Sequence, residues 1–130
     1  MDDVKRVAIE RWLIKAHNDL RTAQTMITVE DPPTDTVCFH AQQCAEKALK
    51  AFLVFKNVHV QRTHSLPRLI ELCRQHHDGF EQFVDCAPEL TVYAVAGRYP
   101  DDWMEIEEEE ARSAVEKAEA ILHFVETRLQ

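Results

Sequence analysis

Residues 34–56 read TDTVCFHAQQCAEKALKAFLVFK, and this stretch decides the fold. Its apolar residues recur at steps of three and four, which is the period of an α-helix with one buried side. The buried side is predicted to hold Val37, Ala41, Cys44, Ala45, Ala48, Leu49 and Phe52. The opposite side carries a polar stripe formed by Thr36, His40, Gln43, Lys47 and Lys50. One helix therefore offers an apolar face for packing and a polar face for other contacts.

Two more long helices are predicted, one before and one after this stretch. Residues 4–27 carry an apolar stripe at helical spacing, and Pro32 and Pro33 stop that helix because proline cannot continue the hydrogen-bond ladder. Residues 103–129 repeat the pattern with several alanines, which let a neighbouring helix come close. Long helices joined by short loops pack antiparallel to one another.

Shorter helical segments are predicted between residues 57 and 102. Ser65 is a suitable N-cap for a helix with Pro67 in its first turn, and residues 80–97 form a further segment. The chain has two glycines and five prolines, too little turn material for a sandwich of short strands. We therefore predict a single all-α domain over residues 1–130, an up-and-down helical bundle of about five helices.

Composition limits the partners of this domain. The formal net charge is −8, so nucleic acid is not attracted by the overall field and would need a local basic groove. No apolar run is long enough to span a membrane, no signal peptide is recognisable, and the four cysteines form no CxxC pair. These features predict a cytoplasmic protein with reduced cysteines and no membrane partner.

No metal or cofactor is predicted. Cys73, His76 and His77 contain ligand-type side chains, but adjacent histidines on a helix point apart. No second cluster supplies the remaining ligands of a four-coordinate site. The sequence also lacks a glycine-rich phosphate loop and a GxSxG nucleophile motif.

Four motifs occur in order along the chain. They are Trp12, Ala16, Asp19, Leu20 and Ala23 in the first helix, FHAQQCAEKALK at 39–50, THSL at 63–66 and RYP at 98–100. In this order and spacing the motifs resemble the HEPN family. The segment at 39–50 is the specific one, with Cys44 at a place where alanine is common in the family.

The resemblance implies a helical bundle that forms a homodimer. It also implies pairing with a minimal nucleotidyltransferase, often as a toxin–antitoxin module. Some HEPN proteins are metal-independent ribonucleases with an arginine followed four to six residues later by a histidine, near the start of the last helix. This chain departs from that pattern, because no histidine follows Arg98 until His123. Arg11 and His17 have the spacing, but six residues along one helix place their side chains about 120° apart.

A nucleotide- or partner-binding groove is predicted where the rarer polar features converge. Its residues are Gln43, Lys47, His64, Arg98 and Tyr99. Gln43 and Lys47 lie one turn apart on the polar stripe, and Tyr99 is suited to stack on a base while Arg98 meets a phosphate. His64 and Arg98 are also the catalytic candidates, because an imidazole titrates near neutral pH.

Structural roles remain alternatives for the same residues. Gln43 and Lys47 would then form a solvated face or a dimer contact, His64 would close a turn, and Arg98 would pair with an acid such as Asp19 or Glu46. Glu46 and Lys50 are expected to form a surface i,i+4 pair worth tenths of a kcal/mol. Three functions follow: a binding module, a ribonuclease with a degenerate site, and a helical interaction protein without ligand.

Overall fold

The computed structural model describes residues 1–95, 100 and 105–130. Every regular element in these ranges is helical, which confirms the all-α prediction. The elements are α1 (Asp3–Met26), α2 (Thr34–Phe55), α3 (Leu66–Arg74), the 3₁₀ helix η1 (Asp78–Phe83), α4 (Cys86–Thr91), the 3₁₀ helix η2 (Val92–Ala94) and α5 (Glu108–Arg128). Arg98 and Tyr99 of the predicted groove lie outside the described residues.

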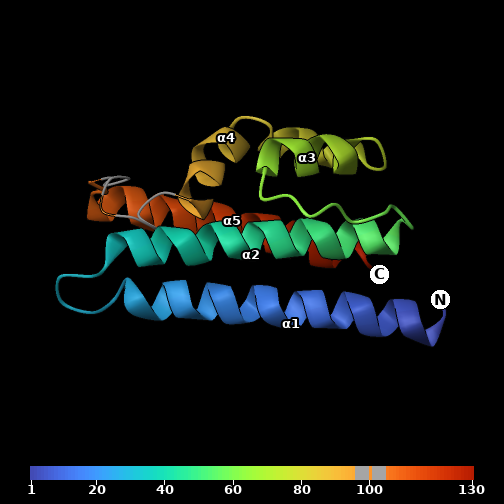
Figure 1. Cartoon of the computed structure of the whole chain (residues 1–130), viewed down its shortest axis with the longest axis horizontal. Coiled ribbons are helices and arrows are strands. Elements are labelled where there is room, and N and C mark those ends of the chain that lie inside the picture. The colour runs from blue at the N-terminus through green and yellow to red at the C-terminus, as the bar shows by residue number, and fades with distance from the viewer. Residues whose placement is uncertain (96–99, 101–104) are drawn as a thin grey trace.

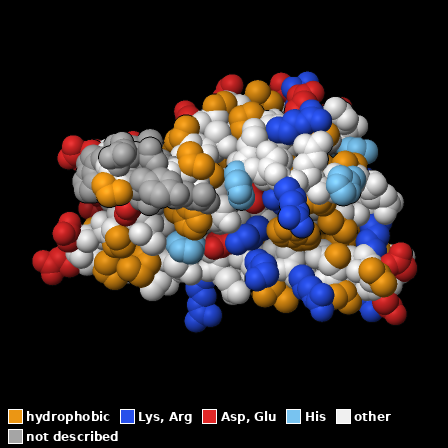
Figure 2. All heavy atoms as spheres, in the orientation of Figure 1, with side chains coloured by type: hydrophobic (Ala, Val, Ile, Leu, Met, Phe, Trp, Pro, Cys, Tyr) orange, Lys and Arg blue, Asp and Glu red, His pale blue; other side chains and the backbone are white. Residues whose placement is uncertain are grey.

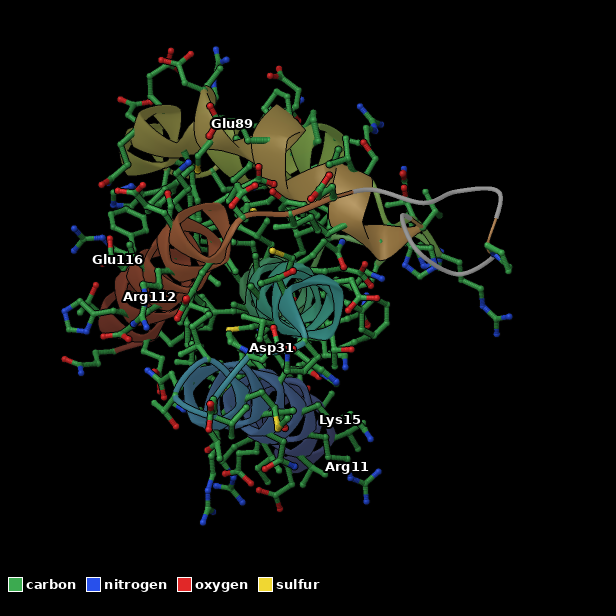
Figure 3. The ribbon with its side chains drawn as sticks, turned by 90° about the vertical axis from the view of Figure 1, so that its left-hand side faces the viewer. Arg11, Lys15, Asp31, Glu89, Arg112 and Glu116 are labelled. Atoms are coloured by element: carbon green, nitrogen blue, oxygen red, sulfur yellow. The ribbon has the colours of Figure 1, made fainter. Side chains whose placement is uncertain are left out.

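Helix α2 lies at the centre of the bundle. Figure 1 shows α1 running antiparallel along one side of it and α5 along another, while α3 and α4 cover a third side. The end-on view in Figure 3 shows the same arrangement around α2. Thirteen of the 22 residues of α2 are buried, including Gln42, Glu46 and Lys50. A central helix of this kind must bury polar as well as apolar side chains.

The ends of α1 and α2 follow from local chemistry, and both predicted ranges are confirmed to within one residue. Asp2 caps α1 by accepting a hydrogen bond from the backbone N–H of Lys5 at 2.8 Å. Asp31 and Asn57 adopt left-handed backbone angles, with φ of 50° and 60°, in the loops that follow the two helices. Asparagine and aspartate tolerate this conformation better than other non-glycine residues, so both helices end where predicted.

The cap of α3 is confirmed, whereas the predicted start of the last helix is wrong. Ser65 accepts a hydrogen bond from the N–H of Arg68 at 3.3 Å, with Pro67 in the first turn. The last helix begins at Glu108 rather than at 103, and Glu107 is extended. The reason is Ile106, which is buried in the core as the chain enters the helix.

A cluster of aromatic rings joins η1 to α5. Phe80 packs against Phe52, and its ring also lies 4.9 Å from that of Phe124. The His77 ring contacts Phe124 edge-on, and its Nδ1 accepts a hydrogen bond from the N–H of Gly79 at 2.9 Å. Gly79 lies so close to this cluster that a Cβ atom would be 2.4 Å from Cζ of Phe124.

Within the described part of the chain, no helix combines the length and apolar character needed to cross a bilayer.

Candidate functional site

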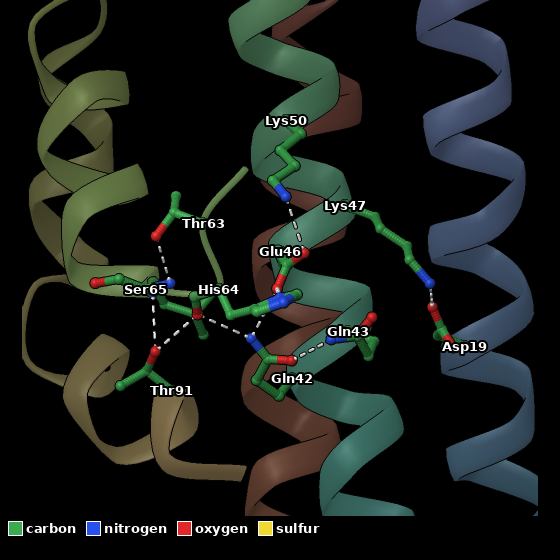
Figure 4. A network of polar contacts seen from close by, with 11 residues as sticks. Asp19, Gln42, Gln43, Glu46, Lys47, Lys50, Thr63, His64, Ser65 and Thr91 are labelled. Carbon is green, nitrogen blue, oxygen red and sulfur yellow. Dashed lines mark hydrogen bonds and ion pairs between the residues drawn. The ribbon is translucent and has the colours of Figure 1, made fainter. Parts of the chain in front are cut away.

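A line of polar side chains runs along α2 through surroundings that are otherwise apolar. We call it the polar seam. It consists of Asp19, His40, Gln42, Gln43, Glu46, Lys47, Lys50 and His64. Most of these residues belong to α2, whereas Asp19 comes from α1 and His64 from the turn before α3 (Figure 4).

Glu46 is the hub of one half of the seam. Its Oε2 accepts a hydrogen bond from Lys50 Nζ at 3.0 Å, and its Oε1 lies 2.9 Å from His64 Nδ1. The side chains of Glu46 and Lys50 are only 5% and 7% exposed. The expected surface pair is therefore a buried ion pair, because α2 is covered on the side where Glu46 and Lys50 lie. Removal of one partner from such a buried pair costs more than removal of one partner from an exposed pair.

Hydrogen bonding keeps Glu46 ionised in this buried position. Burial raises the pKa of its carboxyl, but the hydrogen bonds from His64, Lys50 and Gln42 outweigh that effect and leave the pKa below its ordinary value. Trp12 of α1 supports the arrangement, since Lys50 Nζ lies 5.5 Å from the centre of its ring. The charge of Lys50 is thus shared between a carboxylate and an aromatic face.

Asp19 is the hub of the other half. Lys47 Nζ donates to its Oδ2 at 2.5 Å, and His40 Nδ1 lies 2.8 Å from its Oδ1. These contacts tie α2 to α1. The His40 ring is also held by an edge-on contact with the ring of Phe39, with centroids 5.4 Å apart.

Gln42 connects the seam to the turn before α3. Its amide nitrogen donates to Oε1 of Glu46 and to the backbone carbonyl of His64, both at 3.2 Å. The same carbonyl accepts a hydrogen bond from the Thr91 hydroxyl at 3.0 Å. Gln43 donates in turn to the Gln42 side-chain oxygen at 2.7 Å. The backbone of His64 is therefore fixed from two sides, which leaves its imidazole in a defined position.

The structure brings together three of the predicted site residues, Gln43, Lys47 and His64. The other two, Arg98 and Tyr99, lie outside the described residues. The polar stripe is not the solvated face that the sequence suggested, since Lys47 is paired with Asp19 and Lys50 is buried. The backbone carbonyl of His64 holds the turn, as the structural alternative predicted, and its side chain is 56% exposed.

Five residues of the seam were not predicted as site residues. They are Asp19, His40, Gln42, Glu46 and Lys50. A signal was present, because Gln42, Glu46 and Lys50 follow one another at intervals of four, so that these three polar residues share one side of the helix. Without knowing that α2 is central, these residues look like an ordinary exposed edge. The acids proposed as partners of Arg98 already have lysine and histidine partners.

The surface around the seam is basic although the chain is acidic. Figure 2 shows lysine, arginine and histidine side chains gathered over α1 and α2 on this face, with acidic side chains mainly at its ends. Arg11 and Lys15 are exposed on α1 and lie on the side opposite Arg112 and Glu116 (Figure 3). A local basic surface of this kind is what an acidic protein needs to approach a phosphate.

The seam offers acid–base and anion-binding chemistry rather than a nucleophile. Burial raises the pKa of the Cys38 and Cys44 thiols to about 12, so both remain protonated near neutral pH. Among the described residues, no group of three or more histidine, cysteine, aspartate or glutamate side chains is placed to hold a metal. His64 is different, because Glu46 holds its Nδ1 while more than half of the side-chain surface is exposed.

Comparisons with known proteins identify the fold as one seen before. The HEPN domain profile matches residues 9–128. The crystal structure of TT1696 from Thermus thermophilus has a TM-score of 0.80 and 33% sequence identity, covering 92% of this chain and 96% of that chain. The crystal structure of ST0689, an archaeal HEPN homologue, has a TM-score of 0.75 and 28% identity, covering 94% and 98%. No protein of curated function matches the sequence. The profile spans nearly the whole chain, and the chain belongs to the HEPN domain family.

Proposed function

We propose that this protein is a binding module: a dimeric helical partner of a minimal nucleotidyltransferase, in a toxin–antitoxin type of pair, whose polar seam contacts nucleotide or RNA. The observation that carries the ligand part is the exposed His64 imidazole, which buried Glu46 holds through Nδ1. Basic side chains gather over α1 and α2 on one face of the molecule (Figure 2). Family membership supports the dimer and the partnership.

The assembly is tested with the purified chain and the product of its neighbouring gene. Light scattering at micromolar concentration is expected to give twice the mass of one chain. The neighbouring gene is expected to encode a minimal nucleotidyltransferase that elutes with this protein as one complex. A monomer contradicts the dimer, and two purified proteins that elute separately contradict the partnership.

Ligand binding is tested with a fluorescent mononucleotide and a short single-stranded RNA. His64→Ala is expected to weaken binding of the RNA about tenfold, because it removes one charge-assisted contact to phosphate. His17→Ala is a matched control: His17 is also an exposed histidine on a glutamate, Glu126, but this pair links α1 to α5. Equal affinities for wild type and His64→Ala would show that His64 does not bind the ligand.

A ribonuclease is the second candidate, and one observation favours it. A histidine whose Nδ1 is fixed by a carboxylate has its other nitrogen free to move a proton. The RNA from the binding samples is therefore run on a denaturing gel after incubation in EDTA. We expect it to stay intact, because the family's arginine–histidine spacing is absent. Cleavage that is lost in His64→Ala would make the ribonuclease the better description.

A further inference from the structure

The polar seam repeats one arrangement of three side chains. In each copy, a largely buried carboxylate is bonded to a lysine through one oxygen and to Nδ1 of a histidine through the other. The first copy is Lys50, Glu46 and His64, and the second is Lys47, Asp19 and His40. A structural ion pair needs only the lysine and the acid. The histidine is not needed for the ion pair, and in both copies it lies at the outer edge of the seam.

The geometry of the histidine ring fixes the direction in which the Nε2 atom of each histidine points. Nδ1 and Nε2 lie on opposite sides of the imidazole, so a ring whose Nδ1 contacts a buried carboxylate directs Nε2 away from it. The His64 side chain is 56% exposed and that of His40 is 27% exposed. His17 shows the contrast, because it contacts Glu126 through Nε2.

The lysines make both copies suitable for an anion. A carboxylate behind each imidazole would repel a phosphate, but Lys47 neutralises Asp19 and Lys50 neutralises Glu46. Each copy is then neutral with a neutral histidine and carries one positive charge with a protonated histidine. When the histidine is protonated, an anion at Nε2 meets a positive imidazole that its own carboxylate holds in place.

The spacing of the two copies sets the size of the ligand. His40 and Glu46 are six residues apart on α2, which is about 9 Å along the helix axis. Two histidine rings held by residues that far apart along α2 suit neighbouring phosphates of a strand better than a single phosphate group. We propose that His40 and His64 each bind one phosphate of the same single-stranded RNA, which crosses the seam between α1 and α2. This inference rests on the proposed function, and it adds His40 as a binding residue and a strand as the ligand.

The test uses the asparagine variants of three histidines. The amide nitrogen of asparagine can replace Nδ1–H as a donor to the carboxylate, but it has no group in place of Nε2. His40→Asn, His64→Asn and the control His17→Asn are compared with wild type at roughly pH 6, where ordinary imidazoles are mostly charged. The probes are uridine monophosphate and a uridine hexanucleotide, and melting temperature is measured for every variant.

His40→Asn is expected to weaken hexanucleotide binding about tenfold and to leave uridine monophosphate binding and the melting temperature unchanged. The salt dependence of hexanucleotide binding should also become shallower, by about 0.7 in the slope of log affinity against log salt for each lost contact.

Other results overturn the inference in distinguishable ways. If His64→Asn weakens hexanucleotide binding and His40→Asn does not, His40 is not part of the site. The proposed function is then unaffected. Equal weakening of both probes by His40→Asn would mean a single phosphate site, and equal weakening by His17→Asn would mean diffuse attraction. A wild-type protein that binds neither probe would remove the ligand part of the proposed function and this inference with it.

Discussion

Glu46→Gln is expected to lower the free energy of unfolding by about 3 kcal/mol or more, which is the typical cost of breaking a buried ion pair from one side. Glutamine has nearly the same shape as glutamate, so packing around position 46 is preserved. Lys50, whose side chain is 7% exposed, would however keep its charge without a counterion. Urea unfolding followed by circular dichroism measures the loss directly.

The chain contains a matched control for this prediction. Glu108 and Arg112 form a pair with the same i,i+4 spacing on the exposed surface of α5. Glu108→Gln should change the free energy of unfolding by less than about 0.5 kcal/mol. If both variants lost the same small amount, burial would not strengthen the Glu46–Lys50 pair, and the importance given to the seam would be wrong.

Acid should reproduce part of the Glu46→Gln effect. The pKa of Glu46 is lowered in the folded state, so the unfolded chain binds this proton more readily than the folded protein does. Its contribution to stability is complete above about pH 5 and is lost as the pH falls below the ordinary glutamate value, near about 4.3. Glu46→Gln should lack this part of the acid dependence and retain the rest.

Gly79→Ala is expected to cost about 1–3 kcal/mol, the usual penalty for overpacking a filled site. The new methyl group would lie 2.4 Å from Cζ of Phe124 and 2.9 Å from Nδ1 of His77. The Phe124 ring cannot move away easily, because it also contacts the ring of Phe83. The melting temperature should fall by several degrees while the helical circular dichroism spectrum at low temperature stays unchanged.

A second substitution separates crowding from other causes. Phe124→Leu removes the ring atom that the new methyl group would meet, so Gly79→Ala should cost less in that background than in wild type. The difference between the two costs is a coupling free energy between positions 79 and 124. A coupling near zero would show that crowding against Phe124 is not the reason for the loss.

Helix boundaries were predictable wherever a local feature determines them. Pro32 and Pro33 follow the end of the first helix and Ser65 caps the third, both as expected. The start of the last helix was not predictable in this way. Its position depends on Ile106 being buried before the helix begins, and burial is a property of the assembled bundle.

The candidate site was only partly predictable for a related reason. Gln43, Lys47 and His64 were found because polar residues on one stripe and a histidine beside a helix cap are visible in the sequence. Asp19 and Glu46 were missed as centres because each gathers partners from different segments. A helical stripe shows which residues share a side, but the number of neighbours covering that side decides whether a pair such as Glu46 and Lys50 is exposed or buried.

The residues of the polar seam differ in burial, so substitutions at different positions of the seam differ in their cost to stability. Asp19 and Glu46 hold the helices and the turn together, so substitutions at these two positions are expected to cost stability whether or not the protein binds a ligand. The Nε2 atoms of His40 and His64 are not part of the contacts that hold the helices and the turn together. The two histidine rings can therefore be exchanged while the rest of the seam stays unchanged, and the motif at 39–50 can persist in a protein that binds a different ligand or none.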